Sequence, residues 1–228
     1  MAPMTEDTVR PAGPPALPPA RPGWSLVLPV KPLGLAKSRL ADFAGAHRPR
    51  LALAFALDTA AAALACPAVA RVLVVTRDDE AAAQLSRLGV LVVGDEPGGG
   101  LNAALAHGAA RAAAIAPHAP VAALSADLPA LRPEELARVL AAVPPAARAF
   151  LPDAPGLGTT LLACPPGGPL RPAFGDGSRA RHARGGAREL RPAQVASVRR
   201  DVDTGDDLME ALALGVGPRT AAAAAALV

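Results

Sequence analysis

Three cations, a serine and a glycine gather in one short segment after an apolar run. In WSLVLPVKPLGLAKSRL (residues 24–40) they are Lys31, Gly34, Lys37, Ser38 and Arg39. Ser38 is placed to cap a short helix over 39–43, and backbone amides at a helix start together with three cations favour the binding of a polyphosphate. The Walker A pattern is missing, so a solvated basic turn explains these residues equally well when they are taken alone.

An acidic residue ends a later apolar stretch. In LSADLPAL (residues 124–131) Asp127 follows an expected strand, and Pro129 turns the chain away. Ligands of open α/β sheets bind at the carboxyl ends of the strands, and proteins hold Mg²⁺ with one or two carboxylates plus substrate phosphates. Asp127 is therefore a candidate metal ligand. The alternative is an Asx-type turn before proline.

A second acidic stretch lies near the end of the chain. In DVDTGDDL (residues 201–208) alternation places Asp201 and Asp203 on one side of an extended segment. Thr204 is suited to cap the helix that follows. We expect Asp203 to complete a Mg²⁺ site with Asp127, and Asp201 is the substitute.

A glycine run turns sharply into an expected helix. In GGGLNAAL (residues 98–105) Gly100 allows the backbone to approach a nucleotide closely, and Asn102 can bond a purine edge. A flexible connection is the alternative interpretation of this segment.

Glycine and hydroxyl residues recur in GTT (158–160) and FGDGS (174–178), and His182 follows the second motif. They predict a pocket for a small phosphorylated carboxylate. His182 lies four residues after Ser178, so the two can share a helix face, and packing or capping explains His182 at least as well as catalysis. Nearby arginines are expected to raise the local positive potential; they are Arg179, Arg181, Arg184, Arg188 and Arg191.

The elements that must position these residues alternate along the chain. Short apolar runs with β-branched residues predict strands, and helical stretches separate the early ones. The expected strands are 25–30, 72–76, 90–93, 121–124, 149–151, 159–163 and 195–198, and the expected helices are 50–65, 78–88, 101–116 and 133–142. This order is typical of an α/β fold with a mostly parallel sheet and right-handed crossovers.

One domain is expected to contain these segments. Residues 1–23 are rich in proline and lack the features of a signal peptide, which predicts a disordered leader; the domain is expected over 24–216, with an alanine-rich tail over 217–228. Two distant cysteines and the lack of a long apolar segment favour a cytoplasmic protein with no membrane partner. The excess of 23 basic over 20 acidic residues is too thinly spread for nucleic-acid binding.

Together and in this order, the motifs resemble those of the CofC/FbiD family of guanylyltransferases. The motifs are VKPLGLAKSRL, GLNAAL, SADLPAL, GTT, FGDGSRARH and DVDTGDDL, spread over about residues 24–214. The resemblance implies the Rossmann-like nucleotidyltransferase (GT-A-like) fold. It also implies that GTP is joined to a phosphorylated three-carbon acid, with release of pyrophosphate, in the synthesis of coenzyme F-420.

The resemblance also implies roles for individual residues. The acid-binding positions are Thr160, Gly175 and Ser178, and the Mg²⁺ ligands are Asp127 and Asp203. The expected nucleotide-binding set is Lys31, Lys37, Ser38, Arg39, Gly100 and Asn102, in which the three cations are the catalytic ones. The phosphate of the acid already carries nucleophilic charge, so the site needs to supply charge neutralisation and alignment rather than a general base.

The sequence leaves the acid open between phosphoenolpyruvate and 2-phospho-L-lactate. The Ala/Arg/Pro/Gly-rich composition resembles that of actinobacterial members, which favours phosphoenolpyruvate. A labile product is expected, and with it a hand-off to a downstream F-420 pathway transferase. Many relatives have proline where Gly205 follows Thr204 here, so the start of the last helix is expected to be looser.

Two rival functions make different predictions. A molybdenum-cofactor or sugar-phosphate nucleotidyltransferase predicts a glycine-rich loop after the first strand, where this chain has PVKP (29–32). A non-catalytic nucleotide-binding protein predicts the loss of a metal carboxylate, and both carboxylates are present.

Overall fold

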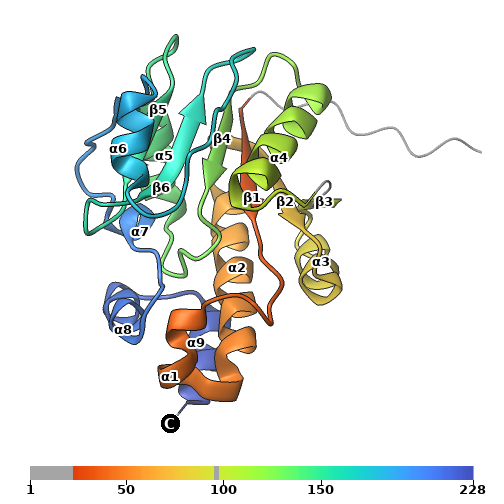
Figure 1. The fold of residues 1–228 in the computed structure, drawn as a ribbon, viewed down its shortest axis with the longest axis vertical. Coiled ribbons are helices and arrows are strands. Elements are labelled where there is room, and N and C mark those ends of the chain that lie inside the picture. Colours follow the sequence, from red (N-terminus) through yellow and green to blue (C-terminus); the bar gives the residue numbers. More distant parts are fainter. Residues whose placement is uncertain (1–22, 95–97, 228) are drawn as a thin grey trace, which may run out of the picture.

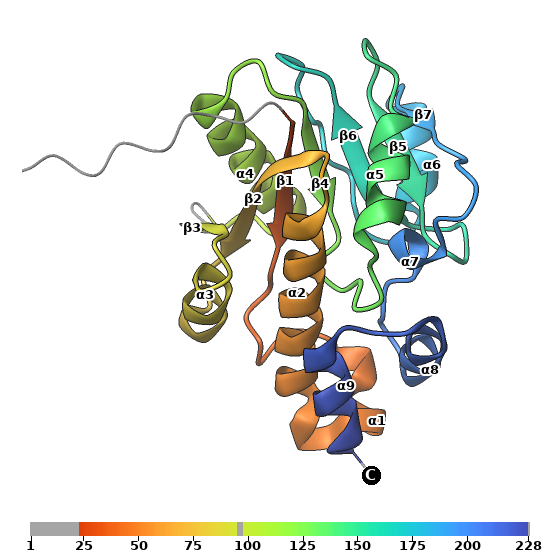
Figure 2. The same ribbon diagram turned by 180° about the vertical axis from the view of Figure 1, so that it is seen from behind.

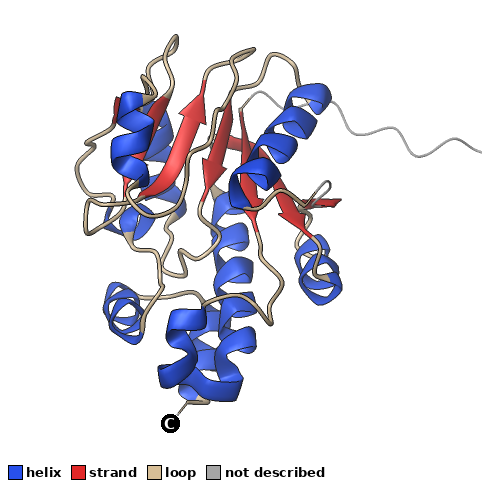
Figure 3. Cartoon of the chain, in the orientation of Figure 1, coloured by secondary structure: helices blue, strands red, loops and turns tan. Residues whose placement is uncertain are grey.

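A central β-sheet carries helices on both faces (Figures 1 and 3). The structure is a computed structural model that describes residues 23–94 and 98–227. In these ranges the strands are β1 (Trp24–Pro29), β2 (Val69–Thr76), β3 (Leu91–Gly94), β4 (Val121–Leu124), β5 (Ala149–Pro152), β6 (Thr159–Cys164) and β7 (Arg188–Glu189). The α-helices there are α1 (Ala41–Ala44), α2 (Arg48–Ala65), α3 (Asp79–Ser86), α4 (Leu101–Ile115), α5 (Pro133–Ala141), α6 (Ser178–Arg184), α7 (Ala196–Arg199), α8 (Gly205–Leu214) and α9 (Pro218–Ala225).

The strand order of the sheet is β3-β2-β1-β4-β6-β5-β7. β1 pairs in parallel with both β2 and β4, whereas β6 runs antiparallel to β4 and to β5. The mostly parallel α/β sheet predicted from the sequence is therefore confirmed. The chain moves outward on one side of β1 and then crosses to its other side at β4, and α/β sheets bind ligands at such a switch point.

Two apolar layers hold the helices on the sheet. α2, α3 and α5 cover one face and α4 and α6 the other, as the two opposite views show (Figures 1 and 2). α4 approaches the sheet closely at Gly108, where an added Cβ would lie 2.5 Å from Val27 Cγ1 and 2.6 Å from Val75 Cγ2. Glycine is required at this position because the strand side chains occupy the space that a side chain would need.

A third apolar cluster lies beyond the carboxyl ends of the parallel strands. There α1, α8 and α9 pack around the first half of α2, with Phe55, Val202 and Leu208 fully buried between them. The buried Asp58 carboxylate on α2 accepts a hydrogen bond from the backbone N–H of Thr220 at 2.7 Å. The segment expected to be a tail therefore contains a helix that belongs to the core of the domain.

One expected strand is a helix in the structure. Residues 195–198 were expected to be extended, but they enter α7, and Val195 and Val198 are both buried on one side of its turn. The buried Glu135 carboxylate accepts hydrogen bonds from Ser197 N at 2.9 Å and from Ser197 Oγ at 2.8 Å, which satisfies an amide at the helix start. Three apolar residues in a run of four fit a strand or a helical turn, so periodicity could not separate the two.

The other expected strands and helices are present with small shifts at their ends, whereas β7 and α9 were not expected. The helix expected over 39–43 is a 3₁₀ turn (Ser38–Leu40) followed by α1, and Lys37 rather than Ser38 occupies its N-cap position. Residues 1–22 of the expected leader lie outside the described residues. In the part of the chain that the structure describes, no helix combines the length and the apolar character needed to cross a membrane.

We expect Gly108→Ala to destabilise the protein. The new methyl group would clash with Val27 Cγ1, and overpacking of this kind lowers the free energy of unfolding by about 1–3 kcal/mol. Urea denaturation would measure the loss. Val27→Ala removes one of the two clashing atoms and leaves Val75 Cγ2 in place, so the Val27→Ala/Gly108→Ala double variant should lose less than the sum of the two single variants. Simple additivity would contradict the close packing.

Candidate active site

A cavity of about 740 Å³ lies at the carboxyl ends of the parallel strands. Its walls come from the loops after β1 and β4, the β5–β6 loop, the start of α6 and the segment before α8. These segments are far apart in the sequence, and the sheet topology brings them together. The cavity occupies the position at which α/β sheets bind their ligands.

Two acidic residues from distant segments meet in this cavity. Val202 N donates to the carbonyl oxygen of Asp127 at 3.1 Å, which joins the segment before α8 to the loop after β4. Val202 is fully buried, so alternation turns Asp201 and Asp203 towards the cavity. The ammonium of Lys37 donates to Asp127 Oδ2 and, at 2.8 Å, to Asp203 Oδ1. The two carboxylates selected from the sequence therefore share one cation.

These contacts change the pKa values of Lys37 and Asp203. Burial lowers the pKa of Lys37, but the charges of Asp127 and Asp203 outweigh burial and raise it overall. Burial raises the pKa of Asp203, but Lys37, with help from Arg39 and Lys31, holds it below its usual value. At neutral pH both partners therefore stay ionised, as an ion pair requires.

Asp201 has the opposite character. Burial, followed by the negative charges of Asp127, Asp203 and Asp153, raises the pKa of Asp201 to about 8. A proton is therefore favoured on this carboxyl at neutral pH. The cavity holds more acidic groups than Lys37 alone neutralises, so additional positive charge is favoured there.

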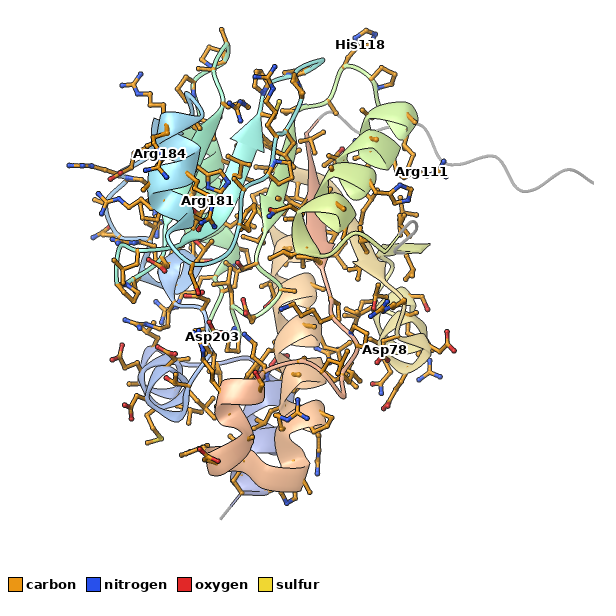
Figure 4. All side chains as sticks on the ribbon, viewed as in Figure 1. Asp78, Arg111, His118, Arg181, Arg184 and Asp203 are labelled. Atoms are coloured by element: carbon orange, nitrogen blue, oxygen red, sulfur yellow. The ribbon has the colours of Figure 1, made fainter. Side chains whose placement is uncertain are left out.

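The loop that carries Lys37 is fixed at two points. Leu33 N donates to Asp78 Oδ2 at 2.8 Å, and the same Asp78 caps α3. The guanidinium of Arg48 donates to the carbonyl oxygens of Ala36 and, at 2.9 Å, of Gly34. Figure 4 shows Asp203 and Asp78 on either side of the segment that follows β1. Lys37 itself has a left-handed backbone with a φ of 55°.

The three cations of this loop are not equivalent. Lys37 is bound to carboxylates, whereas Lys31 and Arg39 line the cavity with no hydrogen bond or ion pair among the described residues. Ser38 also lines the cavity and is exposed. Lys31 and Arg39 are therefore free to bind an anion, which the spacing of the cations alone did not reveal.

The glycine run has a different role from the one expected. Gly100 has a φ of 83° and starts α4, but neither Gly100 nor Asn102 lines the cavity. The amide of Asn102 donates to Phe174 O at 3.1 Å and accepts from Phe174 N at 2.7 Å. Both ends of this amide are engaged, so Asn102 holds the loop before α6, and contact with a purine would require these bonds to break.

The expected acid-binding residues divide into two groups. Gly175 and Ser178 line the cavity; Gly175 has a φ of 113°, and Ser178 is nearly fully buried at the start of α6. Thr160 is fully buried, its hydroxyl has no partner, and it does not line the cavity. The neighbouring Thr159 does line it. The sequence motif did not distinguish these two threonines.

His182 is a buried structural residue. Its Nε2 accepts from Ala173 N at 3.0 Å, so the neutral ring carries its proton on Nδ1, which lies 3.0 Å from Thr159 Oγ1. The ring packs against Phe150 and, edge to face, against Phe174. Burial, with smaller contributions from Arg181 and Arg148, lowers the pKa of His182 to about 4. The packing interpretation of His182 is therefore the one that the geometry supports.

The expected arginine cluster binds backbone and carboxylate groups. Arg179 forms a two-pronged ion pair with Glu189 at 2.9 and 3.0 Å and donates to Gly156 O at 2.9 Å. Arg181, labelled in Figure 4, donates to Ala173 O at 3.1 Å. None of the five arginines lines the cavity. Arg179 and Arg181 therefore fix loops beside the cavity, and the five arginines do not form a basic surface within it.

Sequence reasoning missed Asp153 in the β5–β6 loop. Its carboxylate accepts from Leu157 N at 2.9 Å and from Gly158 N at 2.7 Å, so it shapes the loop that closes the cavity. An added Cβ on Gly158 would lie 2.4 Å from Asp153 Oδ2. The pairing of an aspartate with a glycine five residues later is the signal from which this turn could have been inferred.

Gly205 begins α8, at the helix start that was expected from the sequence to be looser. An added Cβ at Gly205 would lie 2.6 Å from Phe43 Cδ2, so α1 packs closely against this glycine. Thr204 and Asp207 form a complete capping box at the same helix start, with Asp207 N donating to Thr204 Oγ1 at 3.2 Å. The expected cap by Thr204 is confirmed, and the expected loosening has no counterpart in these contacts.

Comparison with solved structures identifies the fold. A nucleotidyl transferase from Methanothermobacter is 18% identical with a TM-score of 0.54, over 82% of this chain and 95% of its own. A 4-diphosphocytidyl-2C-methyl-D-erythritol synthase is 15% identical with a TM-score of 0.57, over 85% of this chain and 99% of its own. Residues 52–198 also match the MobA-like NTP transferase domain. The fold is that of a nucleotidyltransferase.

Curated relatives define the family more closely. A phosphoenolpyruvate guanylyltransferase of Streptomyces coelicolor is 68% identical over 90% of this chain and 97% of its own. One of Thermomonospora curvata is 65% identical over 89% of each chain. The chain belongs to the phosphoenolpyruvate guanylyltransferase family, as the resemblance of its motifs implied.

We expect His182 to make the protein sensitive to acid. The pKa of His182 is 6.5 in the unfolded chain and about 4 in the folded protein. The free energy of unfolding should therefore fall by about 3 kcal/mol as the pH decreases from 6.5 to 4. Urea denaturation of the wild type and His182→Asn across this range would measure it. The stability difference between the two should shrink as pH falls. A constant difference would contradict a buried neutral ring.

Proposed function

We propose that this chain transfers the guanylyl group of GTP to the phosphate of phosphoenolpyruvate and releases pyrophosphate. One observation supports this proposal above others: Asp127 and Asp203 lie together in a cavity that also contains the free cations Lys31 and Arg39. Paired carboxylates and free cations are the groups that a triphosphate and its counter-ion need. The family of the chain indicates the two substrates.

The reaction is an in-line displacement at the α-phosphorus of GTP. A phosphate oxygen of the acid forms the new P–O bond, and the bond from the α-phosphorus to the bridging oxygen breaks, so pyrophosphate leaves with the electron pair. Lys31 and Arg39 bind the triphosphate and neutralise its charge, and Ser38 is the third nucleotide-binding side chain of this loop. Alignment of the two anionic substrates is the main task of the protein.

Mg²⁺ is the proposed cofactor, and the residues fit it. Asp127 Oδ1 is buried with no hydrogen-bond partner, which leaves an acceptor available for a hard cation beside Asp203. Asp127 and Asp203 would hold the ion, and Asp201 is a further carboxylate within the same cavity. When bound, Mg²⁺ would lower the negative charge on the phosphate oxygens and so assist the displacement.

The acid is assigned to the part of the cavity that is formed by β6 and the start of α6. Gly175 and Ser178 line it there, beside Thr159, and their backbone and hydroxyl groups suit a small phosphorylated carboxylate. Thr160 is adjacent in β6 but is fully buried outside the cavity, so Thr159 is the threonine that we assign to the acid. 2-Phospho-L-lactate is the alternative acid, and a role in coenzyme F-420 synthesis with hand-off to a downstream transferase follows from either one.

We expect Asp127→Ala to abolish pyrophosphate release. The reaction should be followed with GTP, Mg²⁺ and each of the two acids in turn. The loss is expected because the substitution removes one of the two proposed metal ligands and one of the two carboxylate partners of Lys37. Asp206→Ala is the control, since Asp206 is exposed and outside the cavity. Near-normal turnover of Asp127→Ala would contradict the metal assignment, and release with 2-phospho-L-lactate alone would replace the proposed acid.

We expect Ser178→Ala to weaken the binding of the acid more than the binding of the nucleotide. Loss of one hydroxyl contact should raise the KM for phosphoenolpyruvate about tenfold, the effect of one lost hydrogen bond to a charged group. The KM for GTP should change little. Ser38→Ala, on the loop after β1, should give the reverse pattern. Equal changes in both KM values for Ser178→Ala would count against the acid pocket.

A further inference from the structure

Lys37 occupies the space between the two carboxylates that are proposed to hold a metal ion. Its ammonium donates to both Asp127 and Asp203, and its side chain is only 11% exposed. A cation bound by both carboxylates would lie close to this ammonium, and two positive charges at such a distance repel strongly in a partly buried site. The ammonium and a divalent cation therefore compete for one position.

The type of residue at this position is informative. Lys31 and Lys37 are the only lysines of the chain, although Lys and Arg together number 23. An ammonium is a compact charge whose donors can point at two separate carboxylates, whereas a guanidinium is a wide planar fork. Apart from Lys31, all the other basic residues of the chain are arginines, and lysine stands at the position where a small cation is needed.

Lys37 does not occupy all the acceptor oxygens of the two carboxylates. The ammonium bonds Asp127 Oδ2, while Asp127 Oδ1 is buried and has no partner. Asp203 remains half exposed on its side chain, and Asp201 and Asp153 add further acidic groups to the same cavity. Asp127 and Asp203 therefore keep acceptor oxygens that the single ammonium of Lys37 does not use.

We propose that Lys37 is a placeholder cation: it holds Asp127 and Asp203 together in the nucleotide-free protein, and a divalent cation that arrives with the nucleotide displaces it. The released ammonium then joins Lys31 and Arg39 on the phosphates. The inference rests on the proposed function for the identity of the nucleotide. The loop itself need not move, because Arg48 and Asp78 fix its backbone while the long Lys37 side chain can turn.

Competition has a measurable consequence in the absence of nucleotide. A divalent cation that both carboxylates bind must first break the Lys37 contacts, so the wild-type protein should bind the ion weakly until nucleotide phosphates are present to bind the released ammonium. Removing the ammonium should lower the Kd for the divalent cation, because the competitor is gone. It should also lower the free energy of unfolding of the cation-free protein, because the two carboxylates then repel each other without a shared cation. A merely catalytic lysine on the phosphates would have neither effect.

The first test is Mn²⁺ titration of the nucleotide-free protein by electron paramagnetic resonance. Lys37→Met should bind Mn²⁺ about tenfold more tightly than the wild type, within the usual range for coupled ligands. Lys31→Met is the matched control, because it removes the same charge from the same cavity without a carboxylate contact, and its effect should be clearly smaller. Unchanged or weaker binding by Lys37→Met, or an equal gain in both variants, would overturn the proposal.

A second test uses the wild-type protein and does not depend on the folding of a variant. With only two lysines, ¹⁵N-lysine labelling gives two side-chain ammonium signals, which the Lys31→Met spectrum assigns. Saturating Mg²⁺ should shift the Lys37 signal or broaden it away and leave Lys31 nearly unchanged. A Lys37 signal that stays constant at saturation would overturn the proposal. Pyrophosphate release by the wild type tests the proposed function separately, since its failure would leave the cation competition intact.

Discussion

The concentration of negative charge at one end of the sheet is the constraint on which the rest of the site depends. Asp127 and Asp203 approach each other because Val202 pairs with the backbone of Asp127, and the Lys37 ammonium offsets the repulsion that this pairing creates. Without a shared cation, two partly buried carboxylates at this distance would favour separation or protonation, as the raised pKa of Asp201 illustrates. This end of the sheet therefore favours the binding of a cation.

The walls of the cavity are loops, and a few polar side chains each fix one of them. Asp78 and Arg48 hold the loop after β1, and Asp153 holds the β5–β6 loop. Asn102 and His182 hold the segment before α6. These residues satisfy backbone groups that a loop would otherwise leave without partners. A rigid site can thus be built from irregular chain, because each loop is tied to a helix or strand of the sheet layers.

Much of this fold could be predicted from local pattern alone. Parallel strands covered on both faces appear as continuous apolar runs, so β1, β2 and β4 were recognisable, and Pro133 marked the start of α5. The pattern was wrong for 195–198, since so short a segment with three apolar residues fits either a strand or a turn of helix. It was silent on α9, because alanine carries little periodic signal and the contact that fixes this helix, from Asp58 to Thr220, joins distant parts of the chain.

The candidate site was predictable as a set of residue types but not as a set of contacts. Position after a strand selected Asp127, and alternation selected Asp203, because both features are local. The left-handed turn at Lys37 and the anchors from α2 and α3 determine which of the three cations binds the carboxylates. This choice cannot be inferred from the spacing of the cations in the sequence. For the same reason Asn102 suggested a base contact while it in fact holds Phe174. Polar residues near a ligand site serve either the ligand or the loop, and only their partners distinguish the two.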